Sequence, residues 1–257
     1  MRRRDPLIFK KALRNTLYFK ASSIRTTSSI LEHHYGTLRC RFSQKFIDGI
    51  VGSRMTLWKS NDERRLTISL RKSGSNDIES ELDLLFQRDS VDLFVMGVVL
   101  VPPCSITATN GKGILVSRVQ GLRVGERPMR SATKSLHEIS PPYALISAVQ
   151  GLGQFLDLRT LYGVTAKNQI WSQPEGPHGD FISAYDEFWD SLGLSEQLPG
   201  YYVSELPLPE KPILSIRQKH RGRTILKREI KKQISSEVLT ALGRMNSPAE
   251  EAWAGQG

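Results

Sequence analysis

The chain has only two cysteines in 257 residues, which excludes a disulfide-stapled scaffold and a cysteine-rich metal centre. Cys40 and Cys104 have neither metal-ligand nor redox spacing, so we predict that both pack as small apolar residues in a reducing compartment. His33 and His34 are adjacent, but neighbouring helix positions point about 100° apart, and no acidic or histidine partner follows at i+3 or i+4. We therefore expect no metal.

Long hydrophobic runs are also missing. The longest apolar stretch, residues 93–101, is about half of the roughly 20 residues that a membrane-spanning helix needs, so we predict a buried strand there. Residues 1–11 carry charge but no continuous apolar segment or small-residue cleavage site. These features predict a cytoplasmic protein.

The formal net charge of +10 is concentrated at the two ends of the chain. Residues 1–25 contain eight Lys and Arg residues against one acidic residue, residues 217–232 contain the same balance, and the remaining chain is net acidic. Such segments can bind an anionic membrane surface, peripherally at the inner membrane, or an acidic protein. Nucleic acid is a weaker candidate, because the sequence has no aromatic stacking strand and no reading helix. The alternative is that both ends are solvated helix faces.

Hydrophobic periodicity predicts a mixed α/β fold. Alternating or continuous apolar residues indicate antiparallel strands at 64–72, 81–88, 91–101 and 113–120, with 91–101 central, and further strands at 160–166 and 201–206. Helical spacing indicates helices at 6–20, around 30–38 with Ser28 or Ser29 as cap, and at 128–139, 143–156, 180–192 and 213–242. Gly193 is a natural stop for the fifth of these. We predict a basic amphipathic segment at 1–25, one α/β domain at 26–212, and a basic helix with a disordered tail at 213–257.

Five short motifs occur in an order that can be recognised. They are Leu31-Glu32-His33-His34-Tyr35, Val119-Gln120-Gly121, Ala132-Thr133-Lys134-Ser135-Leu136-His137, Tyr185-Asp186-Glu187-Phe188-Trp189 and the basic run 217–232. In this order the chain resembles the VirK/YbjX family, a bacterial domain of unknown function also called DUF535. The resemblance implies a role in envelope maintenance, virulence, stress response or tolerance of antimicrobial peptides.

The predicted element order resembles the acyltransferase fold of the GNAT type, with a mainly antiparallel central sheet flanked by helices. That resemblance implies that acyl-coenzyme A is a candidate cofactor, with its diphosphate held by the loop after the fourth strand and the start of the next helix. The matching residues here are Gln120, Gly121, Arg123, Gly125, Arg127 and Arg130. The alternative for these residues is a solvated basic loop.

Catalytic residues are less clearly marked. Many acyltransferases of this type place a tyrosine four residues before a glycine on the later helix, where its hydroxyl protonates the leaving thiolate. Counting back from Gly193 leads to Trp189, whose indole cannot supply a proton at neutral pH. Tyr185, one turn earlier, and His137 are the candidate substitutes, and a structural role is the alternative for each. Beside this enzyme hypothesis stands a non-catalytic scaffold that binds an anionic partner through its basic ends.

Overall fold

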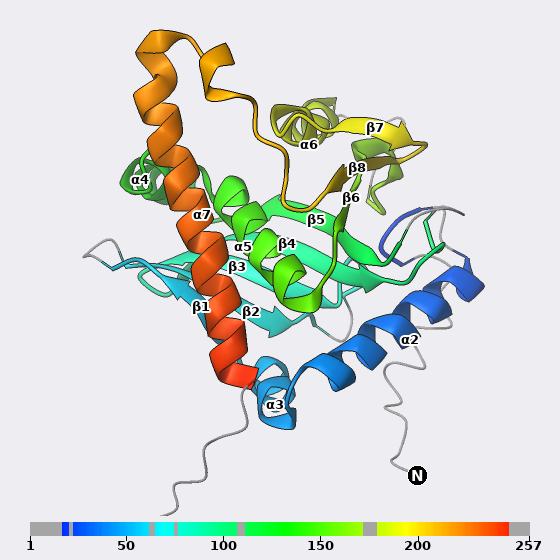
Figure 1. Ribbon diagram of the computed structural model, residues 1–257. Helices are drawn as coiled ribbons and strands as arrows, with labels where there is room; N and C mark the ends of the chain where they lie inside the picture. Colours follow the sequence, from blue (N-terminus) through cyan, green and yellow to red (C-terminus); the bar gives the residue numbers. More distant parts are fainter. Residues whose placement is uncertain are drawn as a thin grey trace, which may run out of the picture.

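The computed structural model describes residues 17–20, 23–61, 65–74, 77–106, 111–171 and 179–246, without the side chains of residues 179–184. Within these ranges, eight strands form one sheet in the order β1-β2-β3-β4-β5-β6-β8-β7, with helices against it (Figure 1). The predicted mixed α/β fold with a mainly antiparallel central sheet is confirmed.

The first half of the sheet is an antiparallel meander. It consists of β1 (Met55–Lys59), β2 (Leu66–Lys72), β3 (Leu82–Arg88) and β4 (Val91–Val101). The strand predicted at 91–101 is confirmed in its bounds, and it lies in the interior of the sheet. Strand β3 was expected to be half-buried, but both of its faces are buried because polar side chains on the second face bond to one another. Strand β1 was not predicted, since its adjacent buried residues Leu57 and Trp58 break the alternation.

The second half of the sheet begins with a parallel pair, β5 (Gly113–Gly121) and β6 (Thr160–Val164). Two helices connect these strands, α4 (Glu126–Ser135) and α5 (Pro141–Leu156). Strand β6 ends two residues before its predicted end, and the short 3-10 helix η1 (Ala166–Asn168) follows. Strands β8 (Tyr201–Glu205) and β7 (Ser195–Leu198) complete the sheet; β7 is short, polar and exposed, and it was not predicted.

Helices α5 and α7 (Gln218–Asn246) cover one face of the sheet (Figure 1). The second half of α7 buries Ile234, Val238 and Leu242 in the main core, so this part of the predicted C-terminal helix is integral to the fold. The first half extends beyond the sheet, and a separate 3-10 helix, η2 (Ile213–Ser215), precedes it. Residues 247–257 lie outside the described residues.

The helices between β5 and β6 differ from their predicted bounds. Helix α4 begins at Glu126 instead of Pro128 and ends before Leu136, because His137 and Glu138 adopt left-handed backbone angles of +51° and +61°. Helix α5 begins at Pro141, not Tyr143: proline suits the first turn, whose amides have no partner within the helix.

Helix α2 (Ile24–Arg41) packs on the opposite face of the sheet, where Ile30 and Leu31 join a second core with Val99 and Leu115. Its cap is Ser23, whose Oγ accepts a hydrogen bond of 3.1 Å from the amide of Thr26, so the prediction of Ser28 or Ser29 was wrong. Helix α3 (Gln44–Gly52), which follows, was not predicted.

The described end of the predicted N-terminal helix is not helical. Leu17, Tyr18 and Phe19 are buried in the second core, and Tyr18 has a φ of +67°. Its amide donates to the carbonyl of Ile78 at 2.8 Å, which ties this segment to the connection between β2 and β3. Residues 6–16 of that predicted helix lie outside the described residues.

Two further expectations are decided by the structure. Gly193 is the stop of helix α6 (Gly179–Ser191), as predicted: it follows the helix by two residues, has a φ of +79°, and its amide donates to the Asp190 carbonyl at 2.9 Å. The expectation that both cysteines are packed inside was wrong, because Cys40 and Cys104 are exposed. Among the described helices, none combines the length and apolarity that crossing a bilayer demands.

The contact between α5 and α7 depends on Gly151. A Cβ at this position would lie 2.4 Å from the backbone carbonyl oxygen of Ser235 and 3.0 Å from Cβ of Val238. We predict that Gly151→Ala lowers the free energy of unfolding by about 1–3 kcal/mol in urea titrations, because the two helices must separate. Gly222→Ala, on α7, is the control, because a Cβ at this position would meet nothing within 4 Å. Its free energy of unfolding should stay the same or rise by up to about 1 kcal/mol. Equal effects in both variants would contradict the role of this contact.

Candidate functional site

The parallel strands β5 and β6 pair over a short distance and then separate. Their register runs from Gly113 opposite Thr160 to Val116 opposite Gly163. Beyond that point β6 ends at Val164, whereas β5 continues to Gly121 beside β4 alone. We call the point of separation the strand fork, and define it by Ser117 of β5 and Val164 of β6, the residues that would have formed the next pair.

Side chains replace the missing ladder bonds at the strand fork. Nε2 of Gln169 donates to the carbonyl of Ser117, and Nε1 of Trp189 donates to the carbonyl of Val164 at 3.1 Å. The Trp189 ring packs over Gly163, where a Cβ would lie 2.6 Å from its atoms. Since a buried carbonyl without a partner costs about 1–3 kcal/mol, these two donors make the separation tolerable.

Strand β5 has a bulge at the same point. Arg118 lies opposite Gly97 and Val116 lies opposite Val98, so that Ser117 has no counterpart on β4. An extra residue reverses the alternation of side chains beyond it. As a result Val116 and Val119 both face the α5 core, and Arg118 is turned to the opposite face of the sheet.

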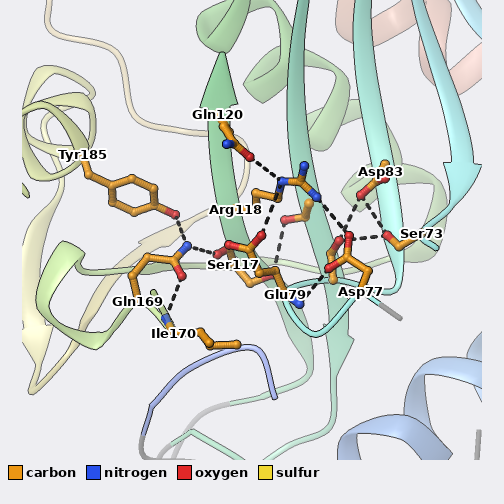
Figure 2. A network of polar contacts seen from close by, with 12 residues as sticks. Ser73, Asp77, Glu79, Asp83, Ser117, Arg118, Gln120, Gln169, Ile170 and Tyr185 are labelled. Atoms are coloured by element: carbon orange, nitrogen blue, oxygen red, sulfur yellow. Dashed lines mark hydrogen bonds and ion pairs between the residues drawn. The ribbon is translucent and has the colours of Figure 1, made fainter. Parts of the chain in front are cut away.

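Arg118 is the centre of a polar network on that face (Figure 2). Its guanidinium donates to Asp77 at 2.9 Å and to the Oε1 atom of Gln120 at 3.1 Å, and it lies 3.6 Å from the carboxylate of Glu79. The side chain of Arg118 is 17% exposed, so its ion pairs are only partly screened by water. These contacts therefore hold the side chains of Arg118 and Gln120, which follow the bulge, in place.

A third carboxylate, that of Asp83 on β3, lies in the same network (Figure 2). It accepts hydrogen bonds from the hydroxyls of Ser73 at 2.8 Å and Ser80 at 2.9 Å, and from Arg71 at 3.1 Å. Asp83 is 1% exposed, and three donors compensate for the loss of its hydration. Gly97 leaves the room that this cluster needs, because a Cβ there would lie 2.6 Å from Cβ of Ser80.

Tyr185 of α6 reaches the strand fork through Gln169. Nε2 of Gln169 donates to the Tyr185 hydroxyl at 3.2 Å while it also donates to Ser117, as Figure 2 shows. Burial raises the pKa of Tyr185, the negative charges of Glu79 and Asp186 add to this, and the bond from Gln169 opposes it only in part. The phenol therefore stays protonated over the physiological pH range, as a polar group next to the bulge.

The second predicted catalytic residue, His137, lies elsewhere. It is exposed just after the end of α4, and α4 and α6 are far apart in Figure 1. The structure thus does not bring His137 and Tyr185 together. Trp189, which occupies the position where a tyrosine acid was sought, is buried and serves as the hydrogen-bond donor to β6.

The predicted cofactor residues lie along the end of β5 and the start of α4. Arg123 and Arg127 are exposed, and their side chains have no hydrogen bond or ion pair within the described residues. Arg130 is paired with Glu126 at 2.9 Å, an exposed i,i+4 contact, and Gln120 accepts from Arg118. The two glycines, Gly121 and Gly125, flank this loop.

Gly125 precedes the first turn of α4 with a φ of +80°, and no side chain caps that turn. At Gly121 a Cβ would make ordinary contacts of 3.6–3.7 Å with Phe94 and Met129. Only Gly125 therefore needs glycine for its backbone angle. The uncapped turn and the guanidiniums of Arg123 and Arg127, which have no partner in the described part of the chain, form a cationic surface directly after β5.

Several residues of the site were not singled out from the sequence. They are Ser117, Arg118, Gln169, Asp77, Glu79 and Asp83. The polar pair Ser117-Arg118, which interrupts an apolar strand, is the one signal that marks the bulge in advance. Gln169 gives no such signal, because its role depends on β5 and α6, which are distant in sequence.

A separate cluster attaches the N-terminal segment near this face. Glu81 is 1% exposed and accepts hydrogen bonds from the hydroxyl of Tyr18 at 2.9 Å and from that of Tyr35. Burial and the charge of Glu81 raise the pKa of Tyr18. Because these two hydrogen bonds hold Tyr18 and α2 against the start of β3, we assign the cluster a structural role.

Comparison with known proteins identifies a family but no chemistry. A family model described as "Protein of unknown function (DUF535)" matches residues 1–233. No curated protein and no solved structure matches the chain.

The charge of Glu79 should make stability depend on pH. Burial is the main reason that the pKa of Glu79 is raised, with contributions from the charges of Asp77 and Asp83, while Arg118 and a hydrogen bond from Trp171 lower it in part. A folded-state pKa above the unfolded one stabilises the protein at acidic pH, and this contribution is lost as pH rises through the folded pKa.

We therefore predict that Glu79→Gln is more stable than the native chain at pH 7 and that the difference shrinks towards pH 4, in urea titrations over that range. The variant Glu229→Gln, at an exposed position of α7, is the matched control and should show no such convergence. A Glu79→Gln variant that is less stable at pH 7 would mean that the ion pair with Arg118 outweighs the burial cost.

Proposed function

Because the chain belongs to the DUF535 family, whose function is not known, we propose from its geometry that it is an acyl-coenzyme A-dependent acyltransferase with a GNAT-like arrangement. The observation that carries the proposal is the strand fork, where two parallel strands separate beside a bulge and a buried tyrosine. Ligands of α/β sheets commonly bind where neighbouring strands diverge at their carboxyl ends.

The diphosphate of the cofactor would bind at the start of α4. The first turn of this helix has no side-chain cap, and the amides of Glu126 and Arg127 have no acceptor within the helix. Arg123 and Arg127, which have no partner within the described residues, would pair with phosphate oxygens. Arg130 and Gln120 are already engaged by Glu126 and Arg118, so they contribute less than the sequence implied.

The acyl group would then lie at the strand fork. Leu122 lies five residues after Ser117 along the extended chain, which is a distance of about 16 Å at the usual rise of a strand. A pantetheine arm laid along this stretch of β5 brings its thioester to the bulge. There it would displace the Gln169 side chain from the Ser117 carbonyl and lie beside Tyr185.

In the transfer step, a nucleophilic acceptor attacks the thioester carbonyl carbon, the carbon–sulfur bond breaks, and coenzyme A leaves as a thiolate. Tyr185 would stabilise that thiolate by a hydrogen bond; its raised pKa disfavours complete proton transfer. The acceptor's proton would pass to Glu79, a carboxylate with a raised pKa that interacts with Tyr185. His137 lies away from the strand fork and takes no part in this scheme.

The resemblance to the VirK/YbjX group supports a biological setting for this activity. In that setting the protein is cytoplasmic and acts in envelope maintenance, virulence or tolerance of antimicrobial peptides. The acceptor would then be a component or precursor of the cell envelope.

Calorimetric titration with acetyl-coenzyme A tests the cofactor site. We predict saturable binding that becomes at least about tenfold weaker in the Arg123→Ala, Arg127→Ala double variant, because two charge-assisted contacts are lost. The matched control is Arg159→Ala, an exposed arginine next to the opposite end of β5 and β6. An affinity that is the same in the native chain and the double variant would contradict the assignment.

A second candidate function is binding to an anionic membrane surface, and the exposed first half of α7 favours it. Residues 211–232 contain nine Lys and Arg residues and one acidic residue. Leu214, Ile225 and Leu226 are 77%, 44% and 40% exposed among these cations. Cationic and aliphatic side chains together suit the interface of an acidic bilayer.

Sedimentation with vesicles tests this surface. We predict that the native chain binds vesicles containing phosphatidylglycerol but not neutral vesicles, and that replacing Leu214, Ile225 and Leu226 by serine weakens the binding. Val51→Ser, at a 59% exposed position on α3, is the matched control and should bind as the native chain does. Unchanged sedimentation of the triple variant would mean that charge alone accounts for the binding, and no sedimentation of the native chain would leave an acidic protein as the partner of this surface.

A further inference from the structure

A hollow of about 360 Å³ lies between α4 and the turn that joins β3 to β4. Its walls combine cationic and apolar side chains, namely Arg88, Asp89, Val91, Leu93, Arg127, Pro128 and Ser131. None of the residues on the β3–β4 side was assigned a role by the sequence or by the proposed function. Their position beside the first turn of α4 makes the hollow a candidate extension of the cofactor site.

The polar side of the hollow carries a net positive charge. Arg127 has no side-chain partner within the described residues, and Nη1 of Arg88 donates to the hydroxyl of Ser131 across the hollow. The one carboxylate there, Asp89, lies 3.6 Å from Arg88 and is shared with Arg65 at 3.5 Å on the other side of the turn. The two guanidiniums and the hydroxyl therefore share one carboxylate, and Asp89 divides its charge between Arg88 and Arg65. This excess of donors favours an anion with several oxygens.

The other side of the hollow is aliphatic. Val91 is 50% exposed at the start of β4, and Pro128 lies opposite it on α4. An exposed aliphatic surface next to paired guanidiniums suits a ligand that has a flat apolar part and a phosphate group, such as a phosphorylated nucleoside.

We propose that this hollow binds the adenosine end of coenzyme A, with the 3′-phosphate between Arg88 and Arg127. The inference rests on the proposed function, in which the neighbouring first turn of α4 holds the diphosphate. The 3′-phosphate and the diphosphate are carried by the same ribose, so a ligand with its diphosphate on this turn places the phosphomonoester close to Arg127. Arg88 then distinguishes coenzyme A from ligands that lack the 3′-phosphate.

Calorimetric titration of the full chain with coenzyme A and with 3′-dephospho-coenzyme A tests the inference. We expect coenzyme A to bind about tenfold more tightly, the effect of one charge-assisted phosphate contact. In Arg88→Gln this preference should fall towards unity while the affinity for 3′-dephospho-coenzyme A is kept. Arg65→Gln is the control, because it removes a partner of Asp89 outside the hollow and should preserve the preference.

The possible failures are distinguishable. Equal affinity for the two ligands, or a preference that Arg88→Gln leaves intact, would overturn the adenosine site and leave the acyl-coenzyme A proposal standing. Binding of adenosine 3′,5′-bisphosphate without binding of coenzyme A would keep an anion site in the hollow but overturn the proposed function. Circular dichroism of each variant establishes that a loss of binding is not a loss of folding.

Discussion

The site depends on one constraint: β5 and β6 must separate after Val116 and Gly163 without leaving buried carbonyls unpaired. Gln169 and Trp189 meet this constraint from two different segments, one on each strand. Gly163 is part of the same solution, because its missing side chain admits the indole ring. The arrangement keeps a parallel pair open at its carboxyl end, which a continuous ladder would close.

Because of the bulge at Ser117, β5 presents a charged side chain to one face of the sheet and an apolar one to the other. It directs Arg118 into a carboxylate-rich network on one face, while Val119 remains in the apolar core under α5. The loop after β5 carries Arg123 and Arg127, cations without a partner among the described residues, and the network near the strand fork carries mostly anions. A ligand that is anionic at one end and reactive at the other fits this division of charge.

The sequence was a good guide where local pattern decides structure. The continuous apolar run predicted the bounds of β4. Gly193 marked the end of α6, because the chain needs a left-handed backbone angle there and glycine adopts it most readily. The i,i+4 pair Glu126 and Arg130 could also have been read in advance. By contrast, the buried polar face of β3 and the cap at Ser23 depend on side-chain bonds that periodicity does not encode.

The strand fork itself could not be predicted, because it requires Ser117, Gln169 and Trp189 to meet from three elements. The most direct test is a crystal structure with a non-reactive thioether analogue of acetyl-coenzyme A. The account predicts the diphosphate against residues 122–127 and the acyl end at Ser117, with the Gln169 side chain displaced. A ligand bound elsewhere, with Gln169 still bonded to Ser117, would contradict it.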